Sequence, residues 1–302
     1  MKIIDKNTIL TTIFIIVDDL LKDIRIKALL HRSSGPEPDM SDSEIITMAL
    51  YQELIGDPRK DHFYRLHADS LRPYFPNLLE RSRYNRRKKD LWQVILVIRI
   101  SILMMLKAYQ EEVGIIDSAP VPVISYKRNK KHTDFTSAGY GVCSSKAMKY
   151  FGYKLHTIVS LCGTILDFML SSATPHDSQA VEELLGVQAS LKEVFGDKAY
   201  WIPEIMAVLK EQKGLILLAC KKDNQEQTEK ERRQGKQLNR LRLMVETVNA
   251  QLQEQLHLSK HYAKSTWGLF TRIAAKITAH TLGMFMNTLF GRPKLALATL
   301  AV

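Results

Sequence analysis

The chain has 302 residues, 45% of them hydrophobic, which is enough to bury a sizeable core in two structural units. Its 43 Lys and Arg residues against 32 Asp and Glu give a formal net charge of +11, so we expect a surface that attracts polyanions such as nucleic acid. Three cysteines without a CxxC pair favour neither a zinc site nor a disulfide framework, and the first apolar run, residues 9–17, is too short to span a bilayer.

The first third of the chain predicts helices. A helical pattern over residues 7–30 is followed by a capping box, Ser41 with Glu44, and a last apolar helix covers residues 91–106. We therefore expect an all-helical N-terminal domain over residues 1–111.

From Val113 the pattern changes to that of strands. It predicts a strand that ends at Asp117, a hairpin over residues 150–170, and then alternating helices and strands up to a long helix that carries Glu246. This order predicts an α/β fold, a ribonuclease-H-like mixed sheet flanked by helices. We expect the sheet domain to cover residues 112–292 and residues 293–302 to form a tail.

Three acidic residues stand where a metal site needs carboxylates. Asp117 and Asp197 each follow an apolar run that reads as a strand, and Glu246 lies in the long helix. Such residues can converge at the edge of a mixed sheet and hold divalent cations, which prefer oxygen ligands. Each residue alone could equally be an ordinary surface acid. The three in this order favour a phosphoryl-transfer site.

The blocks that contain these acids resemble the DDE transposases of bacterial insertion sequences, most nearly those of the insertion sequence 982 family. The resemblance covers nearly the whole chain, with 80 residues separating the two aspartates and 49 separating Asp197 from Glu246. The blocks that carry it are residues 115–121, 196–200 and 245–252, together with residues 40–46, 75–78 and 83–87 of the first half.

The resemblance implies that Asp117, Asp197 and Glu246 form the catalytic triad and bind two Mg²⁺ ions, for which Mn²⁺ can substitute. It implies a cut-and-paste DNA transposase that binds terminal inverted repeats, cleaves DNA by hydrolysis and joins the 3′-hydroxyl to target DNA. The implied partner is double-stranded DNA, bound by a homodimer or larger assembly in the bacterial cytoplasm at the nucleoid, without a membrane. Two alternatives remain open: a metal-dependent nuclease without strand transfer, and a non-catalytic DNA-binding protein that retains the fold.

Basic residues near these elements are candidates for phosphate contact, although dense charge can also be merely solvated. Neighbouring families carry a Tyr-Arg-Glu-Lys pattern around the glutamate. Here the Arg and the Glu are kept, as Arg242 and Glu246, while Asn239 and Gln253 occupy the Tyr and Lys positions. The candidate DNA contacts are Arg81, Arg83, Arg86, Arg87, Lys127, Arg128, Lys130, Lys131 and Arg242. His176 and Asp177 either support the metal site or contact DNA; alternatively, Asp177 or Ser178 simply caps the next helix.

Overall fold

The computed structural model describes residues 4–30, 38–126, 134–143, 147–174, 178–186, 190–219 and 241–300. Its contacts divide the chain into two compact units. The helical unit consists of Met1–Leu106, Gln251–Ala263 and Trp267–Val302, and the sheet unit of Lys107–Ala250 and Lys264–Thr266. None of the described helices is long and apolar enough to cross a membrane.

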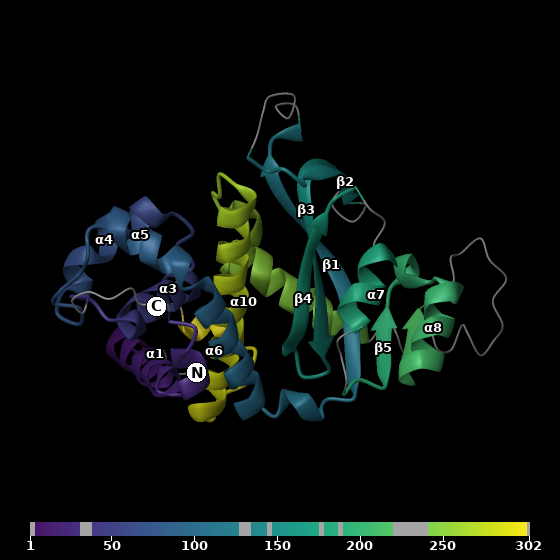
Figure 1. Ribbon diagram of the computed structural model, residues 1–302, viewed down its shortest axis with the longest axis horizontal. Coiled ribbons are helices and arrows are strands. Elements are labelled where there is room, and N and C mark those ends of the chain that lie inside the picture. The colour runs from purple at the N-terminus through teal and green to yellow at the C-terminus, as the bar shows by residue number, and fades with distance from the viewer. Residues whose placement is uncertain are drawn as a thin grey trace. The chain divides into compact units, whose positions relative to one another are not determined.

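The helical unit is built from both ends of the chain (Figure 1). It contains α1 (Lys6–Leu21), α2 (Ile24–Lys27), α3 (Asp42–Leu54), α4 (Lys60–Leu71), α5 (Arg81–Asp90), α6 (Trp92–Met105), the π-helical turn η5 (Gln251–Gln255), the 3-10 turns η6 (Leu258–Lys260) and η7 (Leu297–Leu300), and α10 (Thr266–Leu289). The predicted capping box begins α3: Ser41 accepts from the backbone of Glu44, whose side chain accepts from the backbone of Ser41. One hydrophobic core joins residues such as Ile13 of α1, Ile98 of α6 and Leu282 of α10.

The unit boundaries differ from those expected from chain order. Helix α10, which we expected in the sheet domain, clusters with the helical unit, and every residue from Ile273 to Met284 is buried. A helix that is buried all round belongs in the middle of a core rather than on its surface. The expected tail is also ordered over its described part, because Leu297 and Leu300 of η7 are buried in the same core.

The sheet unit confirms the predicted mixed sheet. It contains η1 (Ala108–Gln110), β1 (Val113–Ile124), β2 (Gly139–Cys143), β3 (Met148–Ser160), β4 (Ile165–Ser172), α7 (Ser178–Gly186), β5 (Glu193–Gly196), η4 (Lys198–Tyr200), α8 (Pro203–Lys213), β6 (Ile216–Ala219) and a helix over residues 241–250. Strand β3 pairs antiparallel with β1 on one side and with β2 and β4 on the other. Strands β5 and β6 then continue the sheet parallel to β1, and this order is that of a ribonuclease-H-like fold.

Helices α7 and α8 cover one face of this sheet (Figure 1). Val181 of α7 and Leu209 of α8 share a buried cluster with Ile116 of β1 and Ile158 of β3. Because side chains alternate along a strand, Asp117 projects from the face opposite to that of Ile116. The first predicted catalytic residue therefore lies on the face that α7 and α8 leave uncovered.

Candidate active site

Asp117 lies within β1 rather than at its end. Strand β1 continues to Ile124 and stays paired with β3, so that Asp117 is opposite Thr157. The prediction that the strand stops at Asp117 is therefore wrong. Pairing of β1 with β5 ends at Ile115. Beyond Ile115, β1 pairs with β3 along one edge. A strand paired along one edge tolerates proline, which has no backbone N–H to donate, and this part of β1 contains Pro120 and Pro122.

The sheet register aligns Asp117 with Asp197. Parallel pairing matches Val113 with Glu193 and Ile115 with Phe195, a constant offset of 80 residues that also separates the two aspartates. Asp197 follows β5 with an extended backbone, φ −77° and ψ −176°. Continued by two residues, the register places the two aspartates on adjacent chains, where neighbouring strands are about 4.8 Å apart.

Packing around Gly196 fixes the backbone that carries Asp197. A Cβ atom on Gly196 would lie 2.8 Å from the Cβ of Tyr200, so only glycine allows this contact. Tyr200 is buried in the cluster under α7 and α8. Asp197 itself caps the turn η4, since its Oδ1 accepts a hydrogen bond of 2.8 Å from the backbone N–H of Ala199. The packing of Gly196–Tyr200 therefore holds the carboxylate of Asp197 in a fixed position.

Asn249 connects the helix over residues 241–250 to Asp117. Its Nδ2 donates a hydrogen bond of 2.9 Å to Oδ2 of Asp117, and because a carboxylate accepts only, this contact fixes the orientation of the amide. The other amide atom, Oδ1, is buried and has no hydrogen-bond partner among the described residues. No motif in the sequence singles out Asn249, although it lies three residues, or about one helical turn, after Glu246.

One face of this helix carries three polar residues at helical spacing. Arg242, Glu246 and Asn249 follow the i, i+4, i+7 pattern of a single face, while Val245 and Val248 are buried. Since Asn249 contacts Asp117, this face is directed to the sheet face that bears the aspartate. Glu246 is exposed and Arg242 is partly buried.

The donor atoms at this site suit a hard divalent cation. Two aligned carboxylates and a buried, unpaired amide oxygen are the oxygen ligands that Mg²⁺ and Mn²⁺ prefer. Among the described residues, no three His, Cys, Asp or Glu side chains lie close enough together to hold a metal ion. The described structure therefore does not bring Asp117, Asp197 and Glu246 together as a closed three-carboxylate group.

The basic residues of α5 divide into two groups. Arg81, Arg83 and Arg86 are exposed. Arg87 instead forms an ion pair with Asp42 and donates to the carbonyl of Met40, so it ties α5 to the start of α3. Four other predicted DNA contacts, Lys127, Arg128, Lys130 and Lys131, lie outside the described residues, as do His176 and Asp177.

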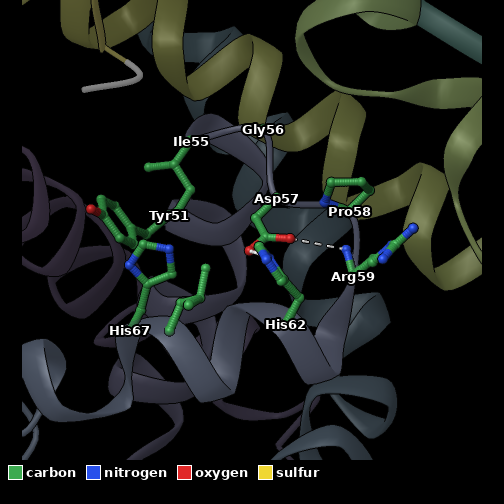
Figure 2. A pocket seen from close by; sticks show the side chains of 9 residues that line it. Tyr51, Ile55, Gly56, Asp57, Pro58, Arg59, His62 and His67 are labelled. Carbon is green, nitrogen blue, oxygen red and sulfur yellow. Dashed lines mark hydrogen bonds and ion pairs between the residues drawn. The ribbon is translucent and has the colours of Figure 1, made fainter.

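A separate hollow of about 460 Å³ lies in the helical unit, between the end of α3 and α4 (Figure 2). Oδ1 of Asp57 accepts there from the backbone N–H of Arg59, and its Oδ2 lies within hydrogen-bond distance, 2.9 Å, of Nδ1 of His62. The guanidinium of Arg59 lies 5.2 Å above the ring of Tyr262, and burial lowers the pKa of His67, which favours a neutral imidazole. The charges in this hollow are mixed, and we assign it no catalytic role.

The comparisons with known proteins concern the sheet unit. A family model described as Transposase DDE domain matches residues 107–266, which is more than half of the chain. The matched range begins at the first residue of the sheet unit, ends at its last, and contains Asp117, Asp197, Glu246 and Asn249. No curated protein and no solved structure shows significant similarity to the chain.

Proposed function

The chain belongs to the transposase DDE domain family, and from this premise we propose that it cuts DNA at the terminal inverted repeats of a mobile element and joins the freed 3′-hydroxyl to target DNA. The observation that carries the proposal is the register that aligns Asp117 with Asp197 across β1 and β5. The hydrogen bond from Asn249 supports it, because it brings the helix of Glu246 to the same sheet face. We further propose that the element is of the insertion sequence 982 type.

In this proposal Asp117, Asp197 and Glu246 hold two divalent ions, Mg²⁺ or Mn²⁺. Bound ions of this kind polarise a phosphate and activate water or a hydroxyl for in-line attack. The amide of Asn249 orients Asp117, and the rigid turn after Gly196 orients Asp197. Arg242, on the same helical face as Glu246, is suited to contact a DNA phosphate near the carboxylates.

Binding of duplex DNA is assigned to exposed basic residues. On α5 these are Arg81, Arg83 and Arg86, whereas Arg87 is already engaged by Asp42. We assign the same role to Lys127, Arg128, Lys130 and Lys131, and a supporting role at the metal site or on DNA to His176 and Asp177. A homodimer or larger assembly on paired element ends, acting at the bacterial nucleoid, completes the proposal, since joining requires two DNA segments in one site.

The test is incubation of the full chain with Mg²⁺, a DNA fragment carrying candidate element ends and a labelled target plasmid. We expect cleaved ends and joined products with the wild-type protein and neither with Asp197→Asn. Cleavage without joining at any Mg²⁺ concentration would show a metal-dependent nuclease instead. Tight binding to the ends without either product would show a DNA-binding protein that has kept the fold but lost the chemistry.

A further inference from the structure

Two exposed tyrosines lie together on the β2 side of the sheet unit. The side chains of Tyr126 and Tyr140 are 43% and 52% exposed, and their ring centroids are 5.5 Å apart at an interplanar angle of 74°. The ring of Tyr140 also contacts Phe151 of β3 at 5.2 Å. Solvent-exposed aromatic side chains that lie together in this way are typical of a ligand-binding surface.

These tyrosines line a hollow of about 440 Å³, which we call the tyrosine hollow. Its described lining is Tyr126, Tyr140, Gly141, Val142, Lys149, Lys154, Ala173 and Thr174. The lining contains two lysines, of which Lys149 is exposed, and no acidic residue among those described. Aromatic rings next to ammonium groups suit a ligand with flat rings and negative charge.

Close packing beneath β2 holds Tyr140 in place. Glycines alternate with exposed residues in this strand, and a Cβ on Gly141 would lie 2.7 Å from the ring of Tyr150. A Cβ on Gly139 would overlap the hydroxyl of Thr174. The backbone of β2 therefore packs closely against Tyr150 and Thr174, and this packing fixes the backbone of Tyr140. A ring that is already positioned loses little entropy when it binds a ligand.

The tyrosine hollow lies along β3 from the predicted catalytic carboxylates. Asp117 is paired with Thr157, and Tyr140 is paired with Phe151 on the same strand. Six residues of strand at about 3.3 Å each span about 20 Å. A DNA strand that passed the carboxylates would cover this distance in about six nucleotides at its duplex spacing.

We propose that the tyrosine hollow binds unpaired nucleobases of the DNA strand that flanks the cleavage site. Bases within a duplex already stack on one another, whereas an unpaired base exposes a π-face that can stack on Tyr140 or Tyr126. Lys149 then pairs with the backbone phosphate beside that base. The inference rests on the proposed function, and it adds that the substrate is recognised through a single-stranded segment.

The test compares two DNAs by fluorescence anisotropy with the full chain in EDTA, so that no chemistry takes place. One is a blunt duplex, and the other is the same duplex with a single-stranded thymidine extension. We expect the wild type to bind the extended DNA about tenfold more tightly than the blunt one. Tyr140→Ala should abolish this preference and leave affinity for the blunt duplex unchanged, and Tyr140→Phe, which keeps the ring, should retain it.

Tyr109→Ala is the matched control, because Tyr109 is also 52% exposed in the sheet unit but does not line the hollow. Thermal unfolding of each variant verifies that the sheet is intact, and Tyr140→Phe tests the ring without removing its packing. Equal binding of the two DNAs by the wild type, or a preference that survives in Tyr140→Ala, overturns the inference. Failure of the wild type to bind either DNA would overturn both the inference and the proposed function.

Discussion

The side-chain amide of Asn249 donates a hydrogen bond of 2.9 Å to Asp117, although 132 positions separate the two residues in the chain. We predict that Asn249→Ala lowers cleavage about 10- to 100-fold, as loss of a group that orients a metal ligand does. The Mg²⁺ concentration for half-maximal rate should rise, and this readout distinguishes a positioning role from a general loss of folded protein. Thr247→Ala is the control, since Thr247 is exposed on the same helix and bonds to the carbonyl of Leu243. A normal Mg²⁺ dependence in Asn249→Ala would exclude the positioning role.

The three acids can be tested by isosteric neutralisation. Asp117→Asn, Asp197→Asn and Glu246→Gln keep the shape of the side chain but remove a charged ligand, so each should reduce strand cleavage to background and leave DNA binding largely intact. Ca²⁺ should support binding better than cleavage, because its looser coordination does not favour in-line geometry. Gel assays of binding and cleavage on one substrate measure both. Any variant that cleaves at the wild-type rate removes its residue from the catalytic set.

Helix α5 offers a contrast between two neighbouring arginines. Arg86 is exposed, so Arg86→Ala should flatten the dependence of log affinity on log salt concentration by about one unit if it contacts a phosphate. Arg87 is held by Asp42 and by the carbonyl of Met40. Arg87→Ala should therefore lower the melting temperature of the protein, whereas Arg86→Ala should not. An unchanged salt slope in Arg86→Ala would mean that DNA runs elsewhere.

A buried acid in the helical unit binds two buried lysines. Glu53 lies 2.6 Å from Lys276 and 3.7 Å from Lys88; burial alone would raise the pKa of Glu53, but these cations outweigh it and lower the pKa. Glu53→Gln should destabilise the protein by about 3–5 kcal/mol, because it leaves buried positive charge uncompensated. Lys88→Met should cost far less, since Glu53 keeps Lys276. Urea unfolding measures both, and equal losses would contradict this account.

The lowered pKa of Lys88 predicts that the free energy of unfolding depends on pH. Burial lowers the pKa of Lys88 to about 8 from an ordinary value of 10.5, so the folded protein releases this proton before the unfolded chain does. The free energy of unfolding contributed by this group should therefore rise between pH 8 and pH 10.5 and be flat below that window. Lys88→Met should lack this rise when the two proteins are unfolded in urea across the same pH series. Parallel curves would place the titration on another group.

Local chemistry made part of this structure predictable, and contacts between distant residues account for the rest. The capping box at Ser41, the mixed sheet and the change of period at Val113 depend on neighbours in sequence, and all three are confirmed. The continuation of β1 past Asp117 depends on β3, and the burial of α10 depends on a core formed by the first hundred residues. Neither could be read from a local pattern.

The candidate site shows the same division. The sequence shows that 80 residues separate the two aspartates. Only the paired strands show that this number equals the register offset between β1 and β5. Asn249 is an ordinary helical residue until its partner across the sheet is known, and Arg87 cannot be distinguished from Arg86 without Asp42. Strand β2 has five residues, two of which are glycine, and this lowers its β-propensity too far for the sequence to predict a strand.

Nearly all of the sheet unit, Lys107–Ala250, lies in sequence between two parts of the helical unit. During synthesis the sheet unit is therefore almost complete before residues 251–300 emerge. The apolar faces of α1, α3 and α6 that pack against α10 stay uncovered until α10 is made. A nascent chain would thus hold an assembled nuclease-like sheet before it holds a finished helical unit. The helical unit can therefore act only after α10 has been made, which follows the synthesis of nearly all of the sheet unit.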